Sequence, residues 1–135
     1  MNALRWELRD VEGRGDLAVI VEDFYDRVRQ DEILGPIFDD VAKVHWETHL
    51  PKIVDFWDTA LFRSGAYRGN PLKPHLDLGR RVAMTWDRFE RWLDLFFATV
   101  DTHFRGERAD HLKRIAADMA AVMSRRIETR SSEAL

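Results

Sequence analysis

The chain has 135 residues, a length typical of one domain with a single hydrophobic core. Its 21 basic and 24 acidic residues give a net charge of −3 and form no basic run, which argues against a general nucleic-acid binder. Cysteine is absent, which excludes disulfides, thiolate-held zinc or iron–sulfur sites, Cys nucleophiles and haem attached through C-x-x-C-H.

Hydrophobic periodicity predicts an all-α fold, because three or four segments have helical spacing and none shows convincing strand alternation. The first predicted helix follows Gly15, with Asp16 as its expected N-cap, and stops before the Gly35-Pro36 pair. Its apolar residues form one stripe: Leu17, Ile20, Val21, Phe24 and Val28.

The second predicted helix covers about residues 44–62 and is interrupted by Pro51. Proline has no N–H to donate and disfavours helical geometry at Leu50, so the long part of this helix either starts near Leu50 or is kinked there. The residues at helical spacing within it are His49, Ile53, Phe56, Trp57, Ala60 and Leu61.

Residues 64–79 form the predicted long connection, since three glycines and two prolines exclude a continuous helix. A third helix is predicted over 85–104, with a heavily aromatic face that includes Phe89, Trp92, Phe96 and Phe97. A fourth covers about 107–127, and the polar tail at 130–135 is expected to fray. The prediction is therefore a single domain, 1–135, with its core at about 16–127.

Targeting and membrane segments are not apparent in the sequence. The first ten residues mix charged with apolar side chains and lack the apolar core of a signal peptide. No stretch approaches the ~20 apolar residues of a membrane span. A cytoplasmic protein without membrane or nucleic-acid partners is therefore expected.

The five histidines are the first candidates for chemistry, because imidazole is the commonest metal ligand. His103 and His111 lie near helix ends among charged residues and are predicted to be surface residues. His45 and His49 are four apart and could chelate a metal ion with an acidic partner. Their H-W-E-T-H string is not H-E-x-x-H, since Glu47 lies about 200° around the helix from each histidine.

His75 has a different setting, P-L-K-P-H-L-D-L, with apolar neighbours after two prolines. Such a histidine is a candidate for burial in a fixed orientation, although a hydrogen-bonded packing histidine remains the commoner case. Tyr25 and Trp92 each bring a hydrogen-bond donor on a mostly apolar ring, and they could also be core aromatics tied to backbone carbonyls.

An apolar pocket with a few convergent donors suits a flat apolar cofactor that has a reactive centre. Haem meets these requirements together, since it needs one firm axial ligand, apolar walls and distal donors. The walls are predicted to be Phe24, Phe38, Ile53, Trp57 and Phe96.

Five segments carry a family pattern: FYDRVR at 24–29, LGPIF at 34–38, HLPKIVDFW at 49–57, GAYRGNPLKPH at 65–75 and FERWLDLF at 89–96. In this order and spacing they resemble the truncated haemoglobins, and within them group III, over nearly the whole chain. The glycine pairs that mark groups I and II are not evident.

The resemblance implies a truncated globin-like two-over-two helical sandwich enclosing haem b, iron protoporphyrin IX. It makes His75 the proximal iron ligand, and it makes Tyr25 and Trp92 the distal donors. His49 takes the distal helix position as a gate rather than a ligand. Phe38 and Ile53 fall on haem-contacting positions, while Pro51 departs from the expected distal helix.

The expected function is reversible binding of O₂, NO and CO, with slow O₂ release because of the two distal donors. O₂ or NO redox chemistry, including NO dioxygenase or peroxidase-like activity with an unidentified reductase, stays open. Two alternatives also stay open: a non-haem metal enzyme that uses His45 and His49, and a helical interaction module without a cofactor. Cations within sequence reach of the haem propionates are Lys73, Arg80 and Arg81, although solvated surface positions are the commoner outcome for such residues.

Overall fold

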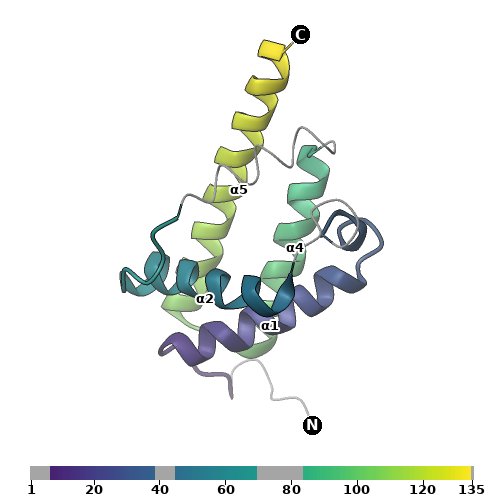
Figure 1. Cartoon of the computed structure of the whole chain (residues 1–135). Helices are drawn as coiled ribbons and strands as arrows, with labels where there is room; N and C mark the ends of the chain where they lie inside the picture. The colour runs from purple at the N-terminus through teal and green to yellow at the C-terminus, as the bar shows by residue number, and fades with distance from the viewer. Residues whose placement is uncertain (1–6, 39–44, 70–83, 135) are drawn as a thin grey trace.

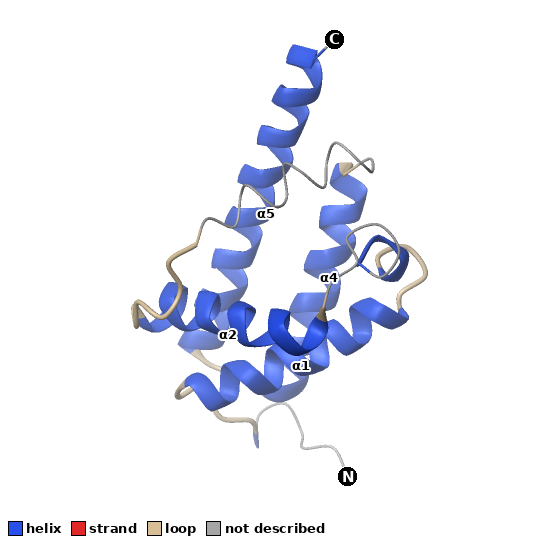
Figure 2. Ribbon diagram, viewed as in Figure 1, coloured by secondary structure: helices blue, strands red, loops and turns tan. Residues whose placement is uncertain are grey.

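The computed structural model describes residues 7–38, 45–69 and 84–134, with side chains up to Glu128. Four long helices make up most of these residues: α1 (Arg14–Gln30), α2 (Trp46–Phe62), α4 (Trp86–His103) and α5 (Glu107–Ala134). No strand occurs in the described parts of the chain (Figure 2). The predicted all-α class is confirmed. None of the described helices is long and apolar enough to cross a membrane.

The helices form two layers of two. Helix α1 packs along α2 and α4 packs along α5, while α1 also contacts α4 and α2 contacts α5. Figure 1 shows the α1–α2 pair running across the lower half of the molecule and the α4–α5 pair rising steeply across it. This arrangement is the predicted two-over-two sandwich.

Helix α1 buries the predicted stripe and ends before the Gly35-Pro36 pair, as predicted, but it begins earlier than predicted. It begins at Arg14 with Gly13 at the N-cap, and Asp16 lies inside the first turn. Asp16 accepts hydrogen bonds from the Arg9 guanidinium, both at 2.7 Å, and from the backbone N–H of Glu12. The helix ends at Gln30 because Asp31 takes extended backbone geometry and its carboxylate accepts backbone N–H groups of the next turn.

Helix α2 runs continuously from Trp46 through Pro51, so the predicted start near Leu50 is wrong. The backbone N–H groups of Thr48 and His49 both donate to the His45 carbonyl and close the first turn ahead of the proline. Pro51 itself is exposed. Because proline has no N–H, the helix continues without the hydrogen bond that residue 51 would donate to the Glu47 carbonyl.

The core extends beyond its predicted limits. Val11, before α1, has no exposed surface, so the buried core begins earlier than residue 16. The backbone of α5 stays helical to Ala134, although the tail from residue 130 was expected to fray. The tail contains no glycine or proline, and a helix can therefore continue past the last core contact.

Asp10 joins the N-terminal segment to the start of α5. Its carboxylate accepts the backbone N–H groups of Arg108 and Ala109, both at 2.9 Å. Burial raises the pKa of Asp10, but the hydrogen bonds from the backbone N–H groups of Arg108, Ala109 and Val11 together lower it by a larger amount. The pKa of Asp10 therefore lies below its usual value. Gly106 has a φ of 152°, and a side chain there would meet Asp10.

Candidate functional site

Eight of the nine predicted haem-pocket residues are in the described part of the chain. The ninth, His75, lies outside the described residues, as do the three candidate propionate partners Lys73, Arg80 and Arg81. The proximal ligand therefore stays a prediction. The distal side can be built from its side chains.

Tyr25 is the centre of the distal side. It is 8% exposed on α1, and its ring lies 5.8 Å from Phe38 and 6.5 Å from His49 between centroids. Burial raises its pKa well above the usual range, while a hydrogen bond from Trp92 opposes this rise. Because an indole N–H can only donate, the Tyr25 oxygen is the acceptor and its own O–H proton stays available. The phenol is therefore neutral, and a donor, at physiological pH.

His49 lies on the α2 side of Tyr25. It is half-buried, and its ring meets the Tyr25 ring edge-on at 82°. Tyr25, Trp92 and His49 thus come from α1, α4 and α2 and gather at one place. The predicted distal trio is close together in space.

The other predicted wall residues pack behind these donors. The ring of Trp92 is stacked on that of Phe96 at 5.4 Å and 2°, and the ring of Trp57 is also stacked on Phe96, at 5.0 Å and 22°. Phe24 meets both Trp92 and Phe96 edge-on, at 5.2 and 5.1 Å. Phe24, Phe96 and Trp57 are buried, whereas Phe38, beside Tyr25, and Ile53, one turn after His49 on α2, are half-buried.

Trp46 lies beside the predicted distal residues and was not predicted from the sequence. Its ring lies 5.3 Å from Tyr25, 5.9 Å from Phe38 and 6.0 Å from His49. Positions 46, 49 and 53 are spaced by three and four, so Trp46 shares the helix face of His49 and Ile53. That spacing is the sequence signal that could have identified it.

Among the described residues, the remaining histidines do not gather into a second site. His45 is exposed at the N-cap of α2, and the described residues contain no group of three side chains suited to a metal ion. His103, expected at the surface, is half-buried, and its Nε2 lies 2.7 Å from an Asp23 carboxylate oxygen on α1. The prediction missed this contact because Asp23 lies 80 residues earlier in the chain. His111 is exposed, as predicted.

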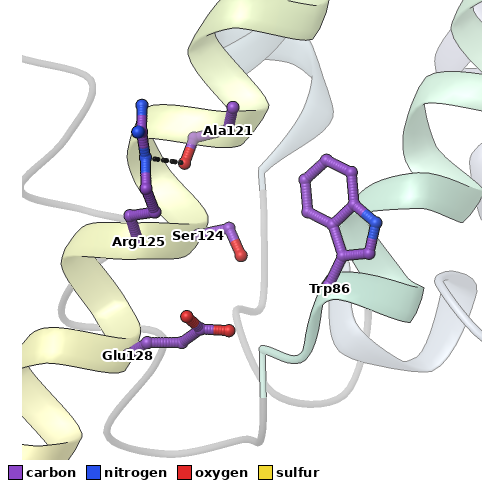
Figure 3. A pocket seen from close by; sticks show the side chains of 5 residues that line it. All are labelled: Trp86, Ala121, Ser124, Arg125 and Glu128. Atoms are coloured by element: carbon purple, nitrogen blue, oxygen red, sulfur yellow. Dashed lines mark hydrogen bonds between the residues drawn. The ribbon is translucent and has the colours of Figure 1, made fainter.

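A hollow of about 380 Å³ opens between the start of α4 and the outer half of α5 (Figure 3). Trp86 faces Ser124 and Glu128 across it. The indole N–H of Trp86 is already used by Glu90, at 3.0 Å. None of the predicted distal residues lines this hollow, so it is separate from the Tyr25 site.

Similarity to known proteins agrees with this geometry. A crystal structure of group III truncated hemoglobin from Campylobacter jejuni matches with a TM-score of 0.79 and 31% identity, over 89% of this chain and 94% of that one. The group 3 truncated hemoglobin ctb of Campylobacter jejuni is 38% identical over 94 residues, which are 67% of this chain and 72% of that protein. The chain belongs to the group III truncated haemoglobins. No protein-family model matches this truncated haemoglobin.

Membership makes the chain a globin-type haem protein, and the residues predicted for its distal side have a chemistry that fits that cofactor. The truncated haemoglobin presents neutral donors, Tyr25 and Trp92, in front of stacked apolar rings. A flat apolar macrocycle needs such walls, and a small ligand on its iron needs such donors.

Proposed function

We propose that this truncated haemoglobin binds haem b through His75 and takes O₂, NO or CO on the opposite face, beside Tyr25, Trp92 and His49. The observation that carries the proposal is the buried Tyr25 hydroxyl, which accepts the Trp92 N–H and keeps its own proton. The names of its relatives, both hemoglobins, support the same function.

The two donors have different tasks. When bound, haem supplies an iron atom that takes diatomic ligands. Trp92 orients the Tyr25 hydroxyl by donating a hydrogen bond to its oxygen. The Tyr25 O–H then donates a hydrogen bond to the bound ligand. A hydrogen bond to a charged acceptor contributes about 1.5 to 3 kcal/mol, so Tyr25 alone would slow O₂ release by about 10- to 150-fold.

The wall residues would hold the macrocycle rather than the ligand. Phe38 and Ile53 are half-buried beside the distal trio and would contact the haem directly. Trp57 and Phe96 form a buried ring stack with Trp92, Phe24 meets that stack edge-on, and together they would fix the indole in place. Slow O₂ release suits O₂ or NO chemistry better than transport.

The proximal assignment is tested by absorbance. The purified protein should show an intense Soret band that shifts with CO, and His75→Ala should lose haem. His45→Ala and His49→Ala are the matched controls, and both should retain it. Normal haem content in His75→Ala would overturn the assignment of the ligand.

The distal assignment is tested by stopped-flow measurement of O₂ release. Tyr25→Phe should release O₂ about 10- to 150-fold faster, because the ring stays and only the donor is lost. Trp92→Phe should accelerate release less, since Trp92 acts partly through Tyr25. Release rates equal to wild type in both variants would exclude the donor role.

A further inference from the structure

Trp46 is the first residue of α2 and touches three side chains of the distal side. Its ring lies against Tyr25 at a 48° tilt and against Phe38 at 31°, and it meets His49 edge-on. None of these contacts is a parallel stack. Trp46 is also only half-buried, so this side of the ring cluster reaches the surface.

Arg29 covers the ring of Trp46 from α1. Its guanidinium carbon lies 5.1 Å from the Trp46 ring centroid, and Arg29 itself is exposed. Arg29 follows Tyr25 by four residues, so both side chains lie on one face of α1, one turn apart. The Trp46 ring therefore contacts Tyr25 on one turn of α1 and Arg29 on the next turn.

A cation–π contact at an exposed position contributes only about 0.5 to 1 kcal/mol, so loss of the Arg29–Trp46 contact alone should have a modest effect. Rotation of Trp46 away from Arg29 would uncover the edges of Tyr25 and His49 at the same time. The Trp46 ring therefore lies between the predicted distal residues and the surface of the molecule.

From this geometry we infer that Trp46 is an outer gate, in front of the gate position that the resemblance gives to His49, through which diatomic ligands reach and leave the predicted distal side, and that Arg29 is the latch that holds it closed. This inference rests on the proposed haem function. It makes Trp46 and Arg29 determinants of ligand entry, a role separate from the hydrogen-bonding role of Tyr25.

A gate and a donor leave different kinetic signatures. A side chain that only blocks the path changes the association and dissociation rate constants by the same factor, so Kd stays constant. A donor stabilises the bound ligand and changes mainly the dissociation rate constant. CO is the suitable probe, because its association can be followed after flash photolysis and its release by displacement with NO.

Trp46→Ala should raise both CO rate constants about tenfold, and Arg29→Gln should raise both about two- to five-fold, the factor expected from loss of one exposed cation–π contact. Arg29→Lys should stay near wild type because it keeps the cation. Trp86→Ala is the matched control for Trp46, since Trp86 is likewise the first residue of a helix and 39% exposed. Arg126→Gln is the control for charge on an exposed helix surface. Both controls should leave the rates unchanged.

The latch also has a readout that does not depend on ligand rates. In the diamagnetic ferrous CO complex, the ring current of Trp46 should shift the Arg29 Hδ protons upfield in NMR spectra. Trp46→Leu should abolish this shift, and Trp86→Leu should keep it. Trp46→Phe, which retains an aromatic ring, should give intermediate rates and guards against misfolding of the smaller variants.

The outcomes separate this inference from the proposed function. If no CO complex forms in the wild-type protein, the haem function fails and the gate fails with it. If CO binds normally but Trp46→Ala and Trp46→Phe keep wild-type rates, only the gate is overturned. A change in dissociation alone would also overturn the gate, because it would assign Trp46 to ligand stabilisation instead.

Discussion

Phe24 and Tyr25 are neighbours on α1, yet they belong to regions of different character. Phe24 is 1% exposed and meets Tyr25, Trp92 and Phe96 edge-on at 4.8 to 5.2 Å. Tyr25 is 8% exposed, and beyond Phe24 its ring neighbours lie at 5.3 to 6.5 Å, on a side that reaches the surface through Trp46 and His49. Successive side chains point about 100° apart on a helix, so one helix serves both regions. Stability and ligand chemistry are therefore encoded on adjacent stripes and should be separable by mutation.

The largest expected effect lies on the packed stripe. Phe96→Ala should lower the free energy of unfolding by about 3 to 5 kcal/mol, because Phe96 has no exposed surface and stacks on Trp57 and Trp92. Urea denaturation measures this loss. Tyr25→Phe is the control and should lose only about 1 kcal/mol, since its ring stays in place. Equal losses in the two variants would erase the distinction between the stripes.

The next effect concerns the polar link that fixes the end of α1 against α4. The Asp31 carboxylate is 3% exposed and accepts hydrogen bonds from Arg91 Nε at 2.8 Å and Nη2 at 2.6 Å. Burial raises the pKa of the Asp31 carboxyl group, but hydrogen bonds from Arg91, Leu34 and Ile33 together lower it by a larger amount, so the pKa lies below its usual value. Asp31→Asn should therefore destabilise the protein by about 2 kcal/mol at neutral pH.

The pH dependence of this loss follows from the direction of the shift. A carboxyl group with a lowered folded-state pKa stabilises the fold above its unfolded pKa, about 3.9, and this contribution is lost as the pH falls through the folded pKa. The stability curves of wild type and Asp31→Asn should converge as the pH falls through the lowered folded-state pKa of Asp31. Curves that stay parallel from neutral pH to below that pKa would show that the charge of Asp31 does not stabilise the fold.

A smaller loss is expected at the start of α5. Asp10→Ala should lower the free energy of unfolding by about 1 to 2 kcal/mol, because two N–H groups in the first turn of α5 lose their acceptor. Glu12→Ala, on an exposed residue of the same segment, should change stability by less than about 0.5 kcal/mol. Both values come from thermal or urea unfolding. If Asp10→Ala lowered the free energy of unfolding no more than Glu12→Ala does, Asp10 would not stabilise the start of α5 as a cap.

The smallest expected effect is that of pH on O₂ release at the side of α1 that contains Tyr25. The raised pKa of Tyr25 keeps its phenol protonated far above neutrality, so O₂ release should be constant between about pH 6 and 10. Stopped-flow release rates across this range measure it, with Tyr25→Phe as the reference. Acceleration with a midpoint near 10 in wild type alone would mean that Tyr25 titrates as an ordinary tyrosine.

Most of the fold follows from periodicity in the sequence. The stripes that contain Phe24, Trp57 and Phe96 predicted helices that bury those residues, and they do. The ends of the helices were harder, because they depend on local backbone hydrogen bonds. Gly13 caps α1 with no side-chain hydrogen bond, and Asp31 ends the same helix by accepting N–H groups that follow it.

The distal site was less accessible to sequence reasoning. Tyr25, His49 and Trp92 come from three helices, and only the family resemblance, not their spacing, brought them together. Trp46 lies at helical spacing from His49, but it was missed because the family pattern in this helix begins only at His49. Its role emerges only when Arg29, on another helix, lies over its ring.

The Asp10 contact also affects how the chain acquires its fold during synthesis. Asp10 caps residues 98 and 99 positions later in the sequence, so the N-terminal segment can settle only after the first turn of α5 has left the ribosome. Helices α1 and α2 emerge earlier, with their inner faces still uncovered by α4 and α5. The last helix to be translated therefore closes the structure, and a nascent chain stalled before Arg108 would remain without the native anchor of its N-terminal segment.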